Sequence, residues 1–326
     1  MTILFGLFML TLLVITAIGI VRSEGLFSAV MLSGIFSLLM AANFFVLDAA
    51  DVALTEAAVG AGVSTVLLLG ALALTPTRER PGSRRVWPAM MAVAANVVVI
   101  GYATVNAPAL GDPTAPVHQH VSPWYLEKTG EYIDIPNVVT AVLASFRGYD
   151  TLGEVFVILI AGIGVLFVLS AGQNRIMSKN PQPRPDEGLR HHLIPQVVSR
   201  MVIPFIVLFG LYVQFHGEYG PGGGFQAGAI VAAALILYSL IEGERAALKL
   251  LPSNVLIFMA VFGAMLYGGV GVVCMLLGGN FLDYSVLAAD PVAGQQAGII
   301  IIELGVGLAV TGVMLTIYHA FASRGS

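Results

Sequence analysis

The sequence is dominated by runs of about 20 apolar residues, separated by short polar segments. A helix rises 1.5 Å per residue, so a run of that length crosses the roughly 30 Å of hydrocarbon in a bilayer. Only 10% of the residues are charged, 57% are hydrophobic and the mean hydropathy is +0.89. Soluble domains carry about 25% charged residues. We therefore expect an all-α, polytopic integral membrane protein.

Nine runs have the length of a membrane span. They lie near residues 2–21, 26–47, 52–75, 86–105, 152–170, 197–215, 225–241, 254–278 and 294–321. No Lys or Arg precedes Arg22, so the first run lacks the basic start of a secretory signal and is expected to be a retained span. Cys274 is the single cysteine, which excludes an intrachain disulfide and a multi-cysteine metal site. We interpret it as an apolar packing residue.

The basic residues favour one orientation of these spans. Lys and Arg accumulate in the cytoplasmic loops of membrane proteins. With nine spans and the N-terminus outside, 13 of the 15 basic residues fall on the cytoplasmic side, and only Lys128 and Arg147 fall outside. The pattern predicts an external N-terminus and a cytoplasmic C-terminus.

The polar segments divide the chain into modules. Residues 171–192 are polar, basic and punctuated by three prolines, which is typical of a linker. A second polar stretch, residues 76–85, divides the first half. We predict a three-helix module (1–75), a two-helix module with a long outer loop (86–170, loop 106–150), the linker, and a four-helix module (193–326).

The outer loop contains a helical pattern. Apolar residues from Val138 to Phe146 follow an i, i+4, i+8 stripe, with Pro136 suited to the first turn and Arg147 to the last. An interfacial or partly inserted helix is expected. His118 and His120 precede it, and a pair at that spacing without a third ligand favours solvated loop residues over a metal site.

Glu56 is the most informative ionisable residue, because a lone carboxylate inside a span is costly and usually lines a path or meets a partner. Asp48 can cap the third span and Asp51 can lie in its first turn, where negative charge is favoured. Glu56 lies about two turns in, on a face with Gly60 and Ser64, among small residues that allow a helix or water to approach. We predict that Glu56 relays protons or Na⁺, and a purely structural hydrogen bond between helices is the alternative.

Two further glutamates lie in spans. Glu154 fits a capping box with Thr151, and Arg147 is close enough to form an ion pair with it, so structural and functional roles both remain open. Glu303 lies about ten residues into the last span and has no capping role, while Gly305 and Gly307 indicate tight packing around it.

A glycine-rich loop joins the sixth and seventh spans: His216-Gly-Glu-Tyr-Gly-Pro-Gly-Gly-Gly-Phe-Gln-Ala-Gly. Gly222, Gly223 and Gly224 permit a tight turn or one that dips into the protein. No Gly-Lys-Ser/Thr follows, so a nucleotide P-loop is excluded. His216 and Glu218 are candidate proton carriers, and a hairpin with a polar rim is the alternative.

Several of these segments resemble known membrane proteins. Asp51-Val-Ala-Leu-Thr-Glu-Ala-Ala-Val-Gly and Phe146-Arg-Gly-Tyr-Asp-Thr-Leu-Gly-Glu resemble the C-terminal part of the large A subunit of Mrp-type multisubunit Na⁺/H⁺ antiporters, and also the D and E subunits of membrane-bound hydrogenases. The region from His192 through the glycine-rich loop resembles the Mrp B subunit, MnhB. The family's B subunit often has His-Gly-His where this chain has His216-Gly-Glu218.

The resemblance implies a cell-membrane subunit of a hetero-oligomeric cation/H⁺ antiporter, with other Mrp-type subunits and the lipid bilayer as partners. It implies ion-translocation roles for Glu56 and Glu154, and the expected path also includes Asp51, Arg147, His216 and Glu303. The chain lacks a long antiporter-like module, so it should not exchange ions alone. No enzymatic activity, metal, cofactor or nucleic acid is expected beyond the transported Na⁺ and H⁺. The alternatives are an ion-translocating arm of a membrane-bound hydrogenase or related redox complex, and a structural scaffold.

Overall fold

The computed structural model describes residues 2–72, 75–79, 86–105, 107–109, 111–176 and 193–325. Within these ranges the regular structure is helical, and an isolated antiparallel bridge pairs Gly25 with Arg78. In the described part of the chain, nine helices are long and apolar enough to cross a membrane: α1 (Thr2–Arg22), α2 (Leu26–Val46), the continuous α3 (Ala50–Thr55), η1 (Glu56–Ser64) and α4 (Thr65–Leu72), then α5 (Val86–Val105), α8 (Gly148–Ile176), α9 (Leu193–His216), α10 (Gly224–Glu242), α12 (Ser253–Leu276) and α13 (Pro291–Gly325). The expected all-α membrane fold is confirmed.

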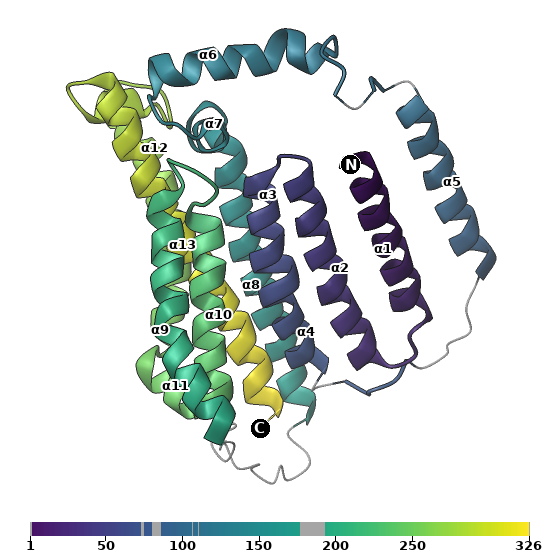
Figure 1. Cartoon of the computed structure of the whole chain (residues 1–326). Helices are drawn as coiled ribbons and strands as arrows, with labels where there is room; N and C mark the ends of the chain where they lie inside the picture. The colour runs from purple at the N-terminus through teal and green to yellow at the C-terminus, as the bar shows by residue number, and fades with distance from the viewer. Residues whose placement is uncertain are drawn as a thin grey trace.

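Helix α13 lies at the centre of the bundle. It packs against α12, α10 and α8, and 67% of its spanning window is buried. Helices α1, α2 and α3–η1–α4 form a row beside α10 (Figure 1). Helix α5 stands apart at the end of this row, and none of its residues 87–105 is buried. The packed core therefore belongs to the C-terminal half of the chain.

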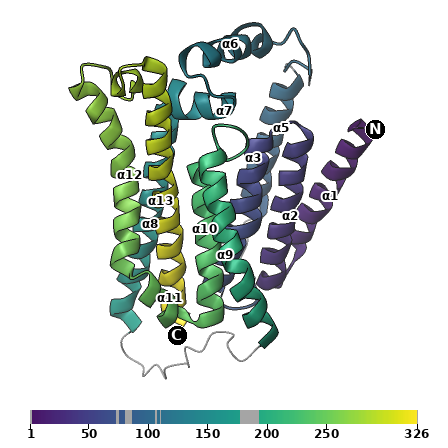
Figure 2. The same ribbon diagram turned by 60° about the vertical axis from the view of Figure 1, so that its left-hand side comes forward.

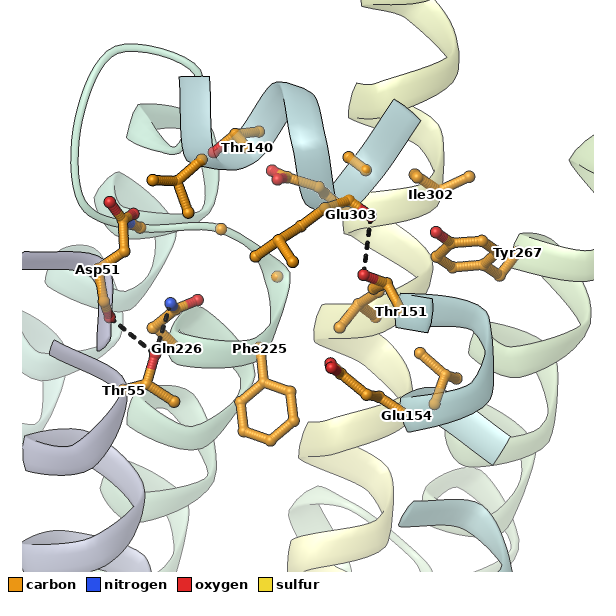
Figure 3. Close-up of a pocket in the computed structure, with 18 of the residues that line it drawn as sticks. Asp51, Thr55, Thr140, Thr151, Glu154, Phe225, Gln226, Tyr267, Ile302 and Glu303 are labelled. Atoms are coloured by element: carbon orange, nitrogen blue, oxygen red, sulfur yellow. Dashed lines mark hydrogen bonds between the residues drawn. The ribbon is translucent and has the colours of Figure 1, made fainter. Parts of the chain in front are cut away.

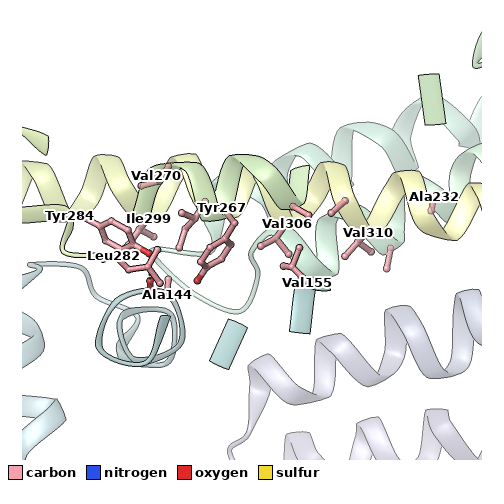
Figure 4. Packing of buried hydrophobic residues seen from close by; sticks show 14 of the residues in the cluster. Ala144, Val155, Ala232, Tyr267, Val270, Leu282, Tyr284, Ile299, Val306 and Val310 are labelled. Carbon is pink, nitrogen blue, oxygen red and sulfur yellow. Dashed lines mark hydrogen bonds between the residues drawn. The ribbon is translucent and has the colours of Figure 1, made fainter. Parts of the chain in front are cut away.

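Small residues let the central helices approach closely. A Cβ atom on Gly263 of α12 would collide with the Gly305 carbonyl oxygen and lie 2.6 Å from the Ala309 nitrogen of α13. Around these contacts a layer of buried apolar side chains joins α12, α13 and α8, and it includes Tyr267 and Val306 (Figure 4). This layer fixes the positions from which α13 and α8 present their glutamates.

Two buried tyrosines keep their hydroxyl groups satisfied within that layer. The Tyr267 hydroxyl donates to the Gly148 carbonyl oxygen at 2.9 Å, and the Tyr284 hydroxyl donates to the Ala144 carbonyl oxygen at 3.1 Å. Tyr284 belongs to the short η4 (Tyr284–Leu287) outside the spans, and burial raises the pKa of its phenol. Both bonds tie the C-terminal half to the chain around the start of α8. Cys274 is fully buried in α12, as its interpretation as a packing residue requires.

The segment between α5 and α8 folds over one end of the bundle. It contains η2 (Val117–Val121), α6 (Ser122–Tyr132) and α7 (Val138–Ala141), which continues into η3 (Val142–Phe146). Figure 2 shows α6 and α7 together at this end, and α11 (Glu244–Leu250) at the opposite end. The expected helix between Val138 and Phe146 is confirmed. His118 and His120 are exposed in η2.

Three expectations about helix ends are wrong. Asp48 does not cap the third span, because it occupies a turn with a φ of 58° and α3 begins after Ala49. Pro136 is not in the first turn of its helix, because Asn137 is the N-cap residue there. Thr151 does not cap α8, because that helix already begins at Gly148. Asp51 does lie in the first turn of α3.

The predicted linker falls mostly outside the described residues. Residues 171–176 continue α8, and residues 177–192 lie beyond the part of the chain that the structure describes. The module boundaries proposed from the sequence therefore stay predictions.

Candidate functional site

A cavity of about 490 Å³ opens where helices from both halves of the chain meet. Its walls come from α3, α7 with η3, α8, α10, α12 and α13, and from the glycine-rich loop between α9 and α10 (Figure 3). The polar lining residues are Asp51, Thr55, Thr140, Thr151, Glu154, Gln226, Tyr267 and Glu303.

Three carboxylates face this cavity. Asp51 comes from the first turn of α3, Glu154 from α8 and Glu303 from the middle of α13. None of the described residues that line the cavity is Lys, Arg or His. A mostly apolar cavity that contains acidic groups and no basic group attracts a cation or a proton. The structure thus brings together three of the six residues that the sequence predicted for the ion path.

The neutral polar residues form a short hydrogen-bonded chain on one wall. The Gln226 amide donates from Nε2 to Thr55 Oγ1 at 2.8 Å, and the Thr55 hydroxyl donates to the Asp51 carbonyl oxygen at 2.9 Å (Figure 3). This chain links the start of α10 to α3. On the opposite wall, the Thr151 hydroxyl donates to the Leu143 carbonyl oxygen at 2.8 Å and joins α8 to η3.

Two glycines let the loop lie directly against Glu303. A Cβ atom on Gly223 would stand 3.1 Å from Glu303 Oε1, and one on Gly217 would stand 3.2 Å from Glu303 Oε2. Gly223 also has a φ of 126°, a conformation that residues with a side chain rarely adopt. Glycine at these two positions therefore leaves room for the Glu303 carboxylate at the edge of the loop.

The loop is also tied to α7 and α3. Asn137 donates from Nδ2 to the carbonyl oxygens of Gly220 and Gly217, at 2.9 and 3.0 Å, and to Asp51 Oδ1 at 3.3 Å. The Gly222 N–H also points to Asp51 Oδ1, at 3.4 Å. One acidic residue of the cavity is thus held by groups from two other segments.

Glu56 does not line this cavity. It begins the π-helical segment η1 and faces α2, because a Cβ atom on the neighbouring Gly60 would lie 2.5 Å from Glu56 Oε1 and 2.8 Å from Ser37 Oγ. Its expected face with Gly60 is correct. Thr55, the residue before it, lines the cavity from the same helix.

Arg147 and His216 also lie away from the cavity lining. The Arg147 guanidinium pairs with Asp150 at 2.5 Å, so the expected pair with Glu154 is wrong. Arg147 directly precedes α8 and Asp150 lies in its first turn, and both side chains are exposed. Asp150 is three residues from Arg147 in the sequence, whereas Glu154 is seven residues away, so Asp150 is the nearer partner. The His216 ring stacks on Tyr212, with ring centroids 4.8 Å apart, at the end of α9.

Glu218 lies in the loop, outside the spans. Its Oε1 atom is buried, and no described residue provides that atom with a hydrogen-bond partner. Burial raises the pKa of this carboxyl above its ordinary value of 4.5. Among the described residues, no group of three or more His, Cys, Asp or Glu side chains is placed to hold a metal ion.

The neutral polar residues of the site were not among those expected from the sequence. Thr55, Gln226 and Asn137 each make a hydrogen bond between segments more than 80 residues apart. Thr55 and Gln226 are polar residues inside apolar runs, and that signal was available in the sequence.

The chain that forms this site is similar to known proteins. A family model described as a domain related to the MnhB subunit of Na⁺/H⁺ antiporter matches residues 194–316. Models for the D and E subunits of MBH match residues 11–77 and 83–175. The putative antiporter subunit mnhB2 of Staphylococcus aureus (strain Newman) is 33% identical over 128 residues, which cover 38% of this chain and 90% of that protein. The chain belongs to the MnhB family.

Two longer relatives of this MnhB-family chain match nearly its whole length. The probable K⁺/H⁺ antiporter A/B subunit of Rhizobium meliloti (strain 1021) is 28% identical over 329 residues, covering 91% of this chain and 32% of that protein. A chain in the structure of the Mrp complex from Dietzia sp. DQ12-45-1b superposes with a TM-score of 0.77 at 27% identity, covering 97% of this chain and 34% of that one. The chain thus spans about a third of the length of these two relatives. The resemblance to a D/E-like region fused to an MnhB-like region is confirmed.

The cavity lies where the three matched regions of the MnhB-family chain meet. Asp51 and Thr55 belong to the region matched by the MBH D model, Thr140 and Glu154 to the region matched by the MBH E model, and Glu303 to the MnhB match. The site therefore exists only when all three regions are packed together.

Proposed function

We propose that this multi-pass membrane protein is one subunit of a multisubunit cation/H⁺ antiporter in the cell membrane, and that its cavity forms part of the ion path. The relatives from Rhizobium meliloti and Dietzia support this function, since one is a probable K⁺/H⁺ antiporter component and the other is part of an Mrp complex. The partners are the other subunits of such a complex. The chain is a transporter subunit rather than an enzyme, and it needs no cofactor besides the transported cation and proton.

The three carboxylates around one cavity carry this proposal. A carboxylate can hold a proton when neutral and a cation when charged, and burial with neighbouring charges sets the balance between the two. Glu303 meets the loop on one side, Asp51 is held by Asn137 and Gly222, and Glu154 faces the cavity from α8. Alternating protonation of these groups would let protons and cations use the same cavity.

Charge-neutralising substitutions test the cavity. Glu303→Gln and Glu154→Gln, each in the assembled complex, should lower cation-induced proton exchange in everted vesicles about a hundredfold or more, as expected for loss of a positioned proton carrier. Asp150→Asn is the matched control, because it lies one turn before Glu154 and pairs with Arg147 instead. The triple variant Asp51→Asn, Glu154→Gln, Glu303→Gln transporting at the normal rate would leave the structural scaffold as the function.

Glu56 receives a separate test, because it lies on the α2 side of its helix. We propose that it relays ions between the cavity wall and the α2 interface, with Gly60 and Ser37 beside its carboxylate. Glu56→Ala should abolish antiport while the complex still assembles, as judged by co-purification of the other subunits. Antiport at the normal rate in this variant would remove Glu56 from the path.

The matches to the D and E subunits of MBH support a second candidate, an ion-translocating arm of a membrane-bound hydrogenase or related redox complex. Gentle purification through a C-terminal tag, followed by mass spectrometry, separates the two. Antiporter-like subunits without iron–sulfur or nickel proteins support the antiporter. Recovery of hydrogenase-type subunits supports the redox complex.

A further inference from the structure

Asn137 joins three segments that are far apart in the sequence. It precedes α7, only 9% of the residue is exposed, and it contacts both the glycine-rich loop and Asp51 of α3. The loop here means residues 217–223. The regions matched by the MBH D, MBH E and MnhB models meet at this one side chain.

The side-chain oxygen, the side-chain nitrogen and the backbone N–H of Asn137 all form hydrogen bonds. Its Oδ1 accepts from the backbone N–H groups of Val139 and Thr140, at 3.0 and 3.4 Å, and so caps α7. Its backbone N–H donates to the Glu218 carbonyl oxygen at 2.9 Å. Nδ2 carries two hydrogens and faces three acceptors, so the two loop carbonyls at 2.9 and 3.0 Å take the better bonds and Asp51 at 3.3 Å shares one.

The loop needs such a fixed partner because its glycines give it many conformations. Four of its seven residues are glycine, and glycine loses more backbone freedom on ordering than any other residue. Only some of these conformations turn the carbonyl groups of Gly217 and Gly220 toward one donor. Thr140 adds a second tie, since its hydroxyl donates to the Gly217 carbonyl oxygen at 2.7 Å.

We propose that Asn137 is a positioning residue that holds the glycine-rich loop against Asp51 and thereby fixes one wall of the cavity. It acts through the loop, whose Gly222 and Gly223 line the cavity, and through the Asp51 carboxylate. The effect on transport rests on the proposed antiport function, whereas the effect on the loop does not.

Two substitutions distinguish the role of Asn137 Nδ2 as a donor to the loop from the role of Oδ1 as the cap of α7. Asn137→Asp keeps an oxygen acceptor for the α7 N–H groups and removes the Nδ2 donor, while Asn137→Ala removes both. Hydrogen–deuterium exchange of the purified complex should show amides of residues 217–223 exchanging about tenfold faster in both variants, which corresponds to about 1.4 kcal/mol. Amides of α7 should keep their protection in Asn137→Asp and lose it in Asn137→Ala. Thr140→Val, which removes one tie, should have a smaller effect.

Transport kinetics give the second readout. If the loop positions the cavity wall, both variants should raise the cation concentration for half-maximal antiport at least about fivefold, with the maximal rate within about twofold of the wild type. A merely structural defect would lower the maximal rate and leave the half-maximal concentration unchanged. Loop exchange within twofold of the wild type in both variants would overturn the proposal, and so would faster exchange with an unchanged half-maximal concentration. If the wild-type complex shows no antiport, the proposed function fails and the exchange result still decides whether Asn137 holds the loop.

Discussion

Glu218 combines a loop position with a buried carboxyl oxygen. Its Oε1 has no hydrogen-bond partner among the described residues, and burial raises the pKa of the group. A carboxyl with a raised pKa favours the neutral form in the folded state, so the folded protein binds more protons than the unfolded chain. The contribution of Glu218 to stability is then fully present below its ordinary pKa of 4.5 and is lost as the pH rises toward the raised value.

This direction of the pH dependence can be tested with Glu218→Gln, whose side chain stays neutral at every pH. The thermal stability of the wild-type complex should fall relative to that of the variant as the pH rises from about 4.5 toward neutral. In this range the Glu218 carboxyl ionises readily in the unfolded wild-type chain but not in the folded protein, where it is buried, whereas the glutamine of the variant does not titrate in either state. Melting temperatures across that pH range measure the difference. A constant difference would show that Glu218 keeps its ordinary pKa in the complex.

At the scale of elements, glycine contacts decide how closely α12 and α13 pack. Gly263 sits where a side chain would collide with the α13 backbone, whereas Gly268, in the same helix, has open space where its Cβ would be. Two glycines of one helix thus have opposite roles. One permits contact between backbones, and the other is free to change.

The pair provides a matched test. Gly263→Ala should destabilise the protein by about 1–3 kcal/mol, because the helices must move apart or distort. Gly268→Ala should be neutral or stabilise by up to about 1 kcal/mol, because alanine is the better helix former. Thermal unfolding in one detergent compares the two variants. Equal effects would mean that α12 and α13 do not depend on this close approach.

At the scale of the whole molecule, the two ends of the bundle carry different features. The glycine-rich loop, α6 and α7 lie at one end of the bundle, and α11 lies at the other end with the C-terminus (Figures 1 and 2). The distribution of Lys and Arg favours the α11 end as cytoplasmic. On this basis we predict that the glycine-rich loop faces the exterior.

Cysteine labelling tests the orientation. Tyr219 is 66% exposed in the loop and Lys249 is exposed in α11, while the native Cys274 is fully buried. Tyr219→Cys should react with a membrane-impermeant maleimide in intact cells, and Lys249→Cys should react only in everted vesicles. The reverse pattern would place the N-terminus inside.

The sequence predicted the spans well, because the thickness of the bilayer fixes the length of each apolar run. The helix between Val138 and Phe146 also followed from its local pattern. Helix ends were less predictable, since Thr151 has the sequence of a cap and yet lies inside α8, where its hydroxyl bonds to Leu143. A cap depends on where the preceding chain turns, and that turn is set by packing.

By itself, the sequence determined a membrane bundle with acidic residues in apolar runs and a glycine-rich loop, since hydropathy and glycine content are local properties. Only the tertiary structure decided which acids share a cavity. Asp51, Glu154 and Glu303 lie about 100 and 150 residues apart in the sequence. They meet because α3 packs against α10, while α10 and α8 both pack against α13. The same packing placed the Glu56 carboxylate against α2. Such choices depend on long-range contacts between helices, which no local pattern contains.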